Sequence, residues 1–364
     1  MRNNDAMRAV FARVAPATRG NLGDCDVRPG IPASVVIATS LGSRLLQRAL
    51  ATVLSGALLA SPLHAAFQDD GWGARPVGMG GAFTAIADDA SAPLYNPAGL
   101  VQVQWNEVSA MYAQLFTGLT LYSGDSTNGG DTVHLDESYL AYISKPIHNI
   151  GSIGISWANF NTTHLYREDT VSLSYARNVG DFVPVLDNSL GFGLNLKYLH
   201  RGISLDPSTV NDPVFQGGSN ASAMTVDVGL LYKPEEGPLN GWRLGLAGKN
   251  LTQPNVGFTD VDREPMEWRL GLAYQSQQRP WLVPALDLVR RDGVNDAHAG
   301  LESWLFHDTL GLRAGVNRDE GAAGLSYYQA VNKNFGFRLD YGFTVPFYVE
   351  GTSGSHRIQA TLYF

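Results

Sequence analysis

After Trp105 the sequence alternates between large apolar residues and small or polar ones. In 190–198, LGFGLNLKY, every second residue is apolar or aromatic, and the residues between them are Gly, Asn and Lys. Successive side chains of a β-strand point to opposite faces, so a period of two predicts a strand with one apolar face. The same period recurs in many later stretches, such as 224–232, 242–249, 268–274 and 335–343.

The alternation occurs in fourteen stretches. An antiparallel barrel with both termini on one side requires an even number of strands, and outer-membrane barrels have short turns on one side and long loops on the other. The connections after the first, third, fifth and seventh stretches are mostly long, although the contrast fades after the eighth. The predicted strands are 106–116, 137–144, 151–160, 169–177, 189–200, 222–233, 241–250, 266–275, 281–290, 297–305, 310–317, 321–329, 335–345 and 355–364. The long connections are 117–136, 161–168, 201–221 and 251–265.

Aromatic residues near the strand ends favour a membrane barrel over a soluble β-sandwich, whose strands also alternate. Trp and Tyr at such positions are typical of the aromatic girdles at membrane interfaces. They are Tyr232, Trp242, Trp268, Tyr274 and Trp281. No run of about eighteen apolar residues occurs, so the sequence has no candidate transmembrane helix. We therefore predict an all-β fold, a transmembrane antiparallel β-barrel of about fourteen strands at 105–364.

The other face of the predicted strands carries charges of both signs. In a barrel this face lines the lumen, where opposite charges can pair across strands and can bind polar groups of an inserted segment. Two interpretations stay open: a wall that supports a plug, and a ring that selects a substrate. The residues placed in the lumen are Lys197, Asp227, Arg243, Lys249, Glu267, Arg269, Asp287, Glu302, Arg313, Arg338, Asp340 and Arg357.

Residues 71–100, GWGARPVGMGGAFTAIADDASAPLYNPAGL, lack this period and are rich in Gly and Ala. The run 82–87 could form one or two helical turns, which the prolines would stop. A segment inserted into a barrel must bring its backbone close to the wall, which favours Gly and Ala. Asp88 and Asp89 would need partners there, because an unpaired buried charge is costly. We predict an N-terminal plug segment at 66–104 in the lumen, with lumen arginines as partners of both aspartates.

The preceding residues are expected to form a leader at 1–65 that ends in a signal peptide at 44–65. Arginines precede a short apolar run at 49–60, and a small residue allows cleavage before Ala66. The single cysteine, Cys25, falls in this leader. The exported chain is therefore expected to contain no disulfide and no cysteine metal site.

Four short motifs lie in order within residues 71–100, namely Gly73–Arg75, Gly78–Phe83, Ala87–Ala90 and Asn96–Leu100. This order resembles the N-terminal segment of barrels of the FadL-type outer-membrane transporter superfamily, and most closely its PorV-like branch. The chain departs from that pattern at Pro76 and Pro93. The resemblance implies that the plug gates the passage of a hydrophobic solute. The plug residues assigned to gating are Gly80, Gly81, Asp88, Asp89, Asn96, Pro97 and Ala98.

The last predicted strand ends in the aromatic residue Phe364, with apolar residues at alternate positions before it. This ending resembles the C-terminal insertion signal of bacterial outer-membrane barrels. It implies contact with the barrel-assembly machinery, surrounding outer-membrane lipid and a bacterial outer-membrane location. The residues assigned to the signal are Ile358, Leu362 and Phe364.

No group of residues predicts catalysis. Ser126 lies in a Gly-Asp-Ser sequence similar to the nucleophile motif of some lipases, but its polar, Gly-rich surroundings indicate a surface loop. The histidines lack a metal-binding spacing, and no Lys-Ser/Thr follows Gly78–Gly81. Without the leader, 19 basic and 31 acidic residues remain, so the net charge changes from −8 to −12 and disfavours nucleic acid. We expect no enzyme, metal, cofactor or nucleic-acid partner. An outer-membrane enzyme would need a His beside a Ser or Asp in the folded barrel.

Two functions remain from this reasoning. The first is passive, plug-gated uptake of small hydrophobic molecules such as fatty acids, as the family resemblance implies. The second is a PorV-like docking or structural barrel for secreted or surface proteins, without transport. In both, the partner binds at the extracellular loops 117–136 and 201–221. Apolar residues near the first of these loops, Phe116, Leu119, Leu121 and Tyr122, lean towards lipid.

Overall fold

The computed structural model describes residues 71–119, 134–148, 150–162, 166–183, 189–205 and 218–364. Several predictions lie outside the described residues. These are the leader with its signal peptide, residues 66–70 of the predicted plug, Ser126, and the central parts of the loops at 117–136 and 201–221.

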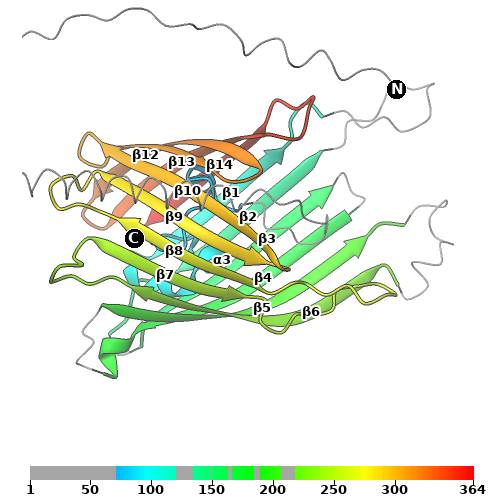
Figure 1. Cartoon of the computed structure of the whole chain (residues 1–364), viewed down its shortest axis with the longest axis horizontal. Helices are drawn as coiled ribbons and strands as arrows, with labels where there is room; N and C mark the ends of the chain where they lie inside the picture. Colours follow the sequence, from blue (N-terminus) through cyan, green and yellow to red (C-terminus); the bar gives the residue numbers. More distant parts are fainter. Residues whose placement is uncertain (1–70, 120–133, 149, 163–165, 184–188, 206–217) are drawn as a thin grey trace, which may run out of the picture. The chain divides into compact units, whose positions relative to one another are not determined.

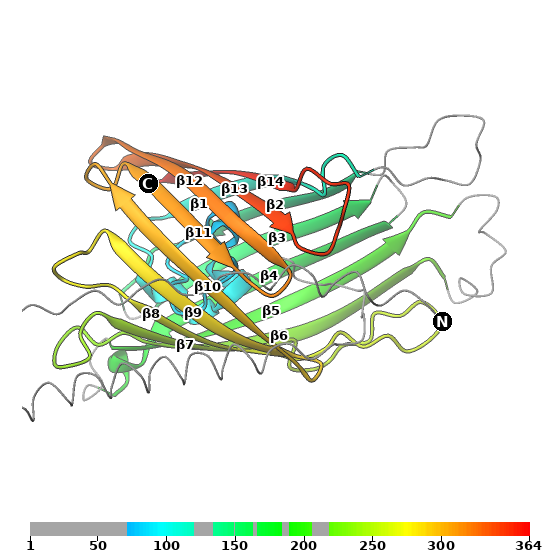
Figure 2. The same cartoon turned by 45° about the horizontal axis from the view of Figure 1, so that its top comes forward.

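Within the described residues, fourteen antiparallel strands form a closed barrel (Figures 1 and 2). Each strand pairs with the next one in the sequence, and β14 closes the ring against β1. The strands are β1 (Glu107–Leu115), β2 (Leu135–Ile143), β3 (Ser152–Thr162), β4 (Tyr166–Asn178), β5 (Leu190–Ile203), β6 (Asn220–Tyr232), β7 (Trp242–Lys249), β8 (Glu267–Tyr274), β9 (Leu282–Arg291), β10 (Val294–Leu305), β11 (Leu310–Val316), β12 (Glu320–Asn332), β13 (Phe335–Pro346) and β14 (Ser355–Tyr363). The predicted fold class is confirmed.

Several predicted connections are too long. The one predicted at 161–168 loses residues to both of its strands, since β3 ends at Thr162 and β4 begins at Tyr166. The sequence prediction left residues 291–296 between the ninth and tenth strands, whereas the structure joins β9 and β10 through Asp292 and Gly293 alone. Both turn residues have positive φ, 47° and 77°, as a type I′ hairpin turn requires. Asp-Gly is the usual sequence signal for this turn, and both strands continue up to it.

Large apolar side chains lie on the outer face of the wall and charged ones on the inner face. In β8, Leu270 is 51% exposed, whereas its neighbour Arg269 is 5% exposed. An apolar outside with a polar inside suits a barrel whose outer face meets hydrocarbon. The three residues assigned to the insertion signal, Ile358, Leu362 and Phe364, are all exposed on the chain's last strand or directly after it.

Four of the five aromatic residues expected at membrane interfaces lie at one end of the barrel, the end where β1 begins and β14 finishes. Tyr232 ends β6, Trp242 begins β7, Tyr274 ends β8, and Trp281 directly precedes β9. The rings of Trp242 and Tyr274 are paired across the β7–β8 ladder, with centroids 4.8 Å apart. Trp268 lies near the other end, at the start of β8.

The inner segment, defined here as residues 71–104, contains short helices. They are α2 (Ala74–Gly78), α3 (Ala92–Tyr95) and the 3-10 helix η1 (Pro97–Gln102). The run 82–87, which could form one or two helical turns, makes a single turn in which the Ala87 N–H donates to the Phe83 carbonyl at 2.9 Å. Prolines begin α3 and η1 instead of stopping a helix, since the first helical positions need no N–H donor. No helix in the described ranges is long and apolar enough to cross a membrane.

The inner segment lies inside the ring of strands (Figures 1 and 2). Its Ala74 N–H donates to Gln359 Oε1 of β14 at 2.8 Å, and its Asn96 side chain donates to the Leu230 carbonyl of β6 at 3.0 Å. These strands belong to opposite sides of the closed barrel. The inner segment therefore spans the lumen.

Candidate functional site

Glycine residues occupy the inward positions at which the wall meets the inner segment. A Cβ at Gly229 would lie 2.1 Å from Asn96 Oδ1, and a Cβ at Gly315 would lie 2.1 Å from the carbonyl carbon of Met79. Both distances are far shorter than a van der Waals contact, so a side chain at either position would displace the inner segment. We call this set the glycine belt. It comprises Gly193 (β5), Gly229 (β6), Gly245 (β7), Gly271 (β8), Gly300 (β10), Gly315 (β11), Gly324 (β12) and Gly342 (β13).

Two predicted plug residues, Gly80 and Gly81, face the wall from the inner segment. Their φ angles are 63° and 80°, in the left-handed region that glycine adopts readily. A Cβ on Gly80 would lie 2.5 Å from the backbone nitrogen of Val316 in β11, and one on Gly81 would lie 2.7 Å from His298 Nδ1 in β10. The structure therefore places both residues where only glycine fits.

Asn96 attaches the inner segment to β6 by neutral hydrogen bonds. Its Nδ2 donates to the carbonyls of Thr84 and Leu230 at 2.9 and 3.0 Å, and its Oδ1 accepts from the Ala98 N–H at 3.1 Å. One side chain thus closes the start of η1, ties two parts of the inner segment together and holds both to the wall. The predicted plug residues Pro97 and Ala98 follow directly and contact Gly193 of β5.

Asp287 of β9, one of the predicted lumen charges, receives the turn after Phe83. Its Oδ2 accepts hydrogen bonds from the Phe83 and Thr84 N–H groups at 3.0 and 2.9 Å and from Thr84 Oγ1 at 2.6 Å. Arg269 of β8 donates to the Gly81 carbonyl at 2.9 Å and lies 3.8 Å from the Asp287 carboxylate. The wall therefore binds N–H groups of the inner segment through a carboxylate and a carbonyl of the inner segment through a guanidinium.

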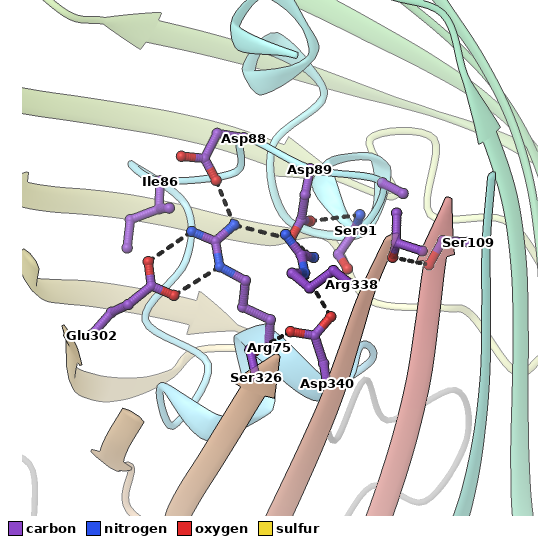
Figure 3. A network of polar contacts seen from close by, with 12 residues as sticks. Arg75, Ile86, Asp88, Asp89, Ser91, Ser109, Glu302, Ser326, Arg338 and Asp340 are labelled. Atoms are coloured by element: carbon purple, nitrogen blue, oxygen red, sulfur yellow. Dashed lines mark hydrogen bonds and ion pairs between the residues drawn. The ribbon is translucent and has the colours of Figure 1, made fainter. Parts of the chain in front are cut away.

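The largest group of charges surrounds Arg75 of the inner segment (Figure 3). Its guanidinium donates twice to Glu302 of β10, through Nε and Nη2, with both distances 2.8 Å. Its Nη1 lies 2.5 Å from Asp88 Oδ1 and 3.0 Å from Asp89 Oδ2. Arg75 therefore joins both predicted plug aspartates to the wall.

The network continues from Asp89 along the wall. Arg338 Nη2 lies 2.8 Å from Asp89, and Arg338 Nε lies 2.7 Å from Asp340 on the same strand, β13. Ser326 bonds to Asp340, and Arg313 of β11 lies 2.5 Å from Glu302. We call these residues the Arg75 network.

Charge balance explains how this network can be buried. With Arg243 of β7, which lies 3.4 Å from Asp88, four guanidinium groups face four carboxylates. They are Arg75, Arg243, Arg313 and Arg338 against Asp88, Asp89, Glu302 and Asp340. Removing one partner would leave a buried charge uncompensated, which is far more costly than losing an exposed ion pair.

Burial and pairing act in opposite directions on the pKa values of the inner segment. Burial alone would raise the pKa of Asp89, but the guanidinium groups of Arg338 and Arg75 outweigh it and lower the pKa from 3.8 to about 2. Burial would lower the pKa of Arg75, but Asp88 and Glu302 raise it well above its usual value. Both groups therefore carry charge at neutral pH.

The remaining predicted lumen charges pair with the wall itself. Lys197 of β5 lies 3.0 Å from Asp227 of β6, and Lys249 of β7 lies 3.7 Å from Glu267 of β8. Arg357 of β14 lies 3.3 Å from Glu137 of β2, which the sequence analysis did not single out. All the predicted lumen charges are buried, but they form several groups around the ring rather than one selecting ring.

The sequence analysis missed three important contacts of the inner segment. Arg75 was quoted only as part of a motif, although it is the single basic residue among residues 71–104. Gln359 lies between Arg357 and Thr361 on the polar side of the last strand, so strand phase could have placed it inside. Glu107 accepts a hydrogen bond from the Ala90 N–H at 2.8 Å. It begins β1, so the alternation of that strand could also have placed its side chain inside.

A small cavity remains between the inner segment and the wall, toward the end of the barrel with the long connections. Its volume is about 40 Å³, which is room for a few water molecules. Trp72, Pro93 and Leu94 of the inner segment form its apolar part, and the Lys197–Asp227 pair forms part of its polar lining. The lining is therefore mixed.

Solved structures with this fold include hydrocarbon channels. The toluene transporter TbuX of Ralstonia pickettii is 13% identical, with 81% of this chain and 98% of that chain covered and a TM-score of 0.53. The monoaromatic hydrocarbon channel CymD is 16% identical, with 82% and 99% covered and a TM-score of 0.53. A deltaS2 mutant of the monoaromatic hydrocarbon channel TodX is 15% identical, with 81% and 98% covered and a TM-score of 0.57. At these identities the similarity concerns the fold.

The family comparison concerns the sequence of the barrel. No curated protein matches the chain. The model of the type IX secretion system membrane protein family PorP/SprF matches residues 132–362, which lie wholly outside the inner segment and its PorV-like motifs. This match covers more than half of the chain, and the protein therefore belongs to the PorP/SprF family of type IX secretion system membrane proteins.

Proposed function

We propose that this protein is a bacterial outer-membrane barrel that docks protein partners of type IX secretion, while the inner segment keeps its lumen closed. The observation that carries the proposal is the Arg75 network. Its buried ion pairs connect the inner segment to β7, β10 and β13 across the lumen. On the β3–β7 side, the cavity between the inner segment and the wall holds only about 40 Å³. Opening a path past the Arg75 network would separate several buried charges, which is costly. The family and the barrel fold support the location.

The docking surface is proposed at the connection between β13 and β14, residues 347–354. Phe347 and Tyr348 are 55% and 73% exposed there, with their rings in an edge-to-face contact. The loop is held by the chain after β1, since the Thr117 N–H donates to the Gly354 carbonyl at 2.8 Å and the Ser353 N–H donates to the Thr117 carbonyl at 2.7 Å. Exposed aromatic residues on a backbone held in this way are typical anchors of protein interfaces.

Substitution of Phe347 and Tyr348 by serine tests the docking role. A Phe347→Ser, Tyr348→Ser double variant is expressed in cells that lack the parent gene, and secretion of a type IX cargo is measured. Loss of two anchors is expected to lower secretion at least about tenfold. The matched control is Phe306→Ser, because Phe306 is 73% exposed on the opposite end of the barrel and should leave secretion unchanged. Normal secretion by the double variant, with the barrel folded in the membrane, would reject the docking surface.

The passage of small hydrophobic molecules is a second candidate. It is supported by the fold shared with TbuX, CymD and TodX, and by the apolar contribution of Trp72, Pro93 and Leu94 to the cavity. An Asn96→Ala, Pro97→Ala variant loosens the inner segment without touching the Arg75 network. Protein-dependent uptake of labelled aromatic hydrocarbons or fatty acids that changes in this variant would favour passage. Absence of protein-dependent uptake with the barrel inserted would leave docking as the function.

The kinship to the PorV-like branch is a narrower proposal, supported by the motifs in residues 71–100. Under this proposal the docked partners are secreted or surface proteins. Insertion of the barrel would use the assembly machinery, through Ile358, Leu362 and Phe364. Deletion of Phe364 tests that step, since a barrel that still inserts at its normal level would not depend on the terminal aromatic residue.

A further inference from the structure

The outer face of β8 and β9 changes character near the end of the barrel that carries the long connections. Leu272 and Leu286 are paired across the two strands, and so are Leu270 and Leu288. All of these leucines face outward. The next outward pair is Trp268 with Arg290. An apolar band that ends in Trp and Arg marks the depth at which hydrocarbon gives way to lipid headgroups.

Trp268 packs against the neighbouring strand of the wall. Its indole lies over Gly248 of β7, where a Cβ would approach Trp268 Cζ3 to 2.8 Å. Leu251 lies beside the same glycine, so the ring has a shaped seat formed by β7 and the chain after it. The ring also borders a space that is lined by the residues leading into β8.

That space is an open hollow of about 310 Å³, which we call the rim hollow. Arg263, Met266, Trp268 and Arg290 are among its lining residues. Both arginines are exposed, and in the part of the chain that the structure describes neither has an ion-pair partner. The carboxylate of Glu264, which also reaches the hollow, is buried and lies 2.8 Å from Arg291. Asp292, in the turn after β9, also lines the hollow and is exposed, so the exposed charges of the lining are two guanidinium groups against one carboxylate, an excess of positive charge.

We propose that the rim hollow binds a phosphate-bearing headgroup of an outer-leaflet lipid. Two guanidinium groups supply donors for phosphate oxygens, and Arg is well suited to this geometry. The leucine pairs next to the hollow would pack against the acyl chains of the same lipid, and Trp268 would lie at its interface. Free phosphate would use the arginines alone, so the adjoining apolar band favours a lipid. This site is independent of whether the protein docks partners or passes solutes.

Lipid exchange in detergent tests the proposal. The purified barrel is mixed with bis-phosphorylated lipid A, with enzymatically dephosphorylated lipid A, or with inorganic phosphate, and bound lipid is measured by native mass spectrometry. The expected order of binding is phosphorylated lipid first, with dephosphorylated lipid at least about fivefold weaker. Arg290→Gln and Arg263→Gln should each weaken binding of the phosphorylated lipid about fivefold, as one surface cation does.

Arg279→Gln is the matched control. Arg279 is an exposed arginine close to an exposed tryptophan, Trp281, but it lies at the opposite end of the barrel and lines no part of the rim hollow. Equal weakening by Arg279→Gln would show a general charge effect and overturn the site. Unchanged binding in Arg290→Gln would also overturn it, as would equal binding of both lipids or displacement of the lipid by millimolar inorganic phosphate.

Discussion

The inner segment is attached to the two sides of the barrel by different chemistry. On the side of β10–β13, Arg75 and Asp89 make buried ion pairs to Glu302 and Arg338. On the side of β5 and β6, Asn96 makes neutral hydrogen bonds while its backbone neighbours rest against glycine. Charge attraction weakens gradually with distance, whereas repulsion between overlapping atoms rises steeply. The glycine belt makes both sides sensitive to the shape of the wall, whereas the charged side is also sensitive to which charged groups are present.

Substitution of Arg75 should disrupt the ion pairs on the charged side and give the largest loss of stability. In Arg75→Met, Asp88 loses its closest base, Asp89 keeps only Arg338, and Glu302 keeps only Arg313. We expect the free energy of unfolding to fall by about 3–5 kcal/mol, the cost of breaking a buried ion network. Urea unfolding in lipid vesicles, followed by tryptophan fluorescence, measures this change. Arg75→Lys keeps the charge and should lose less. A loss below about 1 kcal/mol in Arg75→Met would mean that the network is freely replaced by water.

Addition of one methyl group should break the neutral side. A Cβ at Gly229 would overlap Asn96 Oδ1 at 2.1 Å, so Gly229→Ala must move the Asn96 side chain. The expected loss is about 3 kcal/mol, at the upper end for overpacking. Gly321→Ala in β12 is the control, because a Cβ there would meet only the Phe347 ring at 3.6 Å. The same unfolding assay compares the two. Equal stability of both variants would show that the glycine belt is not needed for the fit.

Acid should weaken the charged side through Asp89. The folded pKa of Asp89, about 2, lies below its usual 3.8, so Asp89 contributes stability that is complete above about pH 4. This contribution, about 2 kcal/mol, is lost as the pH falls through 2. Unfolding is measured between pH 6 and pH 2, and the fall in stability should be about 2 kcal/mol smaller in Asp89→Asn than in the parent and in Asn96→Ala. An identical pH profile in Asp89→Asn would place the acid sensitivity elsewhere.

Asn96→Ala should give the smallest effect, about 1 kcal/mol, because one neutral side chain is lost and no charge is exposed. The same variant tests whether the Asn96 side chain is what the Cβ of Gly229→Ala overlaps. Without Oδ1, the Cβ of Gly229→Ala has more room, so this substitution should cost less in the Asn96→Ala background than in the parent. A double-mutant cycle measures the difference. Strict additivity would show that Gly229 and Asn96 act independently.

The wall and the contacts of the inner segment differ in how far they could be predicted from the sequence. The wall was predictable because the period of two assigns every strand residue to a face, and Lys197 and Asp340 are as buried as that phase requires. The Asp292-Gly293 turn carried a signal that was not used. The connection was left too long because Val294–Asp296 lacks the strict alternation of the other strands.

The site was less predictable because its partners are far apart in the sequence. Arg75 and Glu302 are separated by 227 residues, and no local pattern names the partner of a single arginine. The helices of the inner segment were misplaced since proline can either end a helix or begin one, and the choice depends on tertiary contacts. The glycine belt is visible in the sequence only as glycines among many others.

The contact between Ala74 and Gln359 links the beginning of the described chain to its last strand, across 285 residues. Gln359 also donates to Ser109 of β1 at 2.8 Å, within the seam that closes the ring. Contacts of such long sequence separation form late in folding. One side chain of β14, Gln359, thus contacts both the inner segment and the seam. Closing the ring and enclosing the inner segment therefore depend on the same strand.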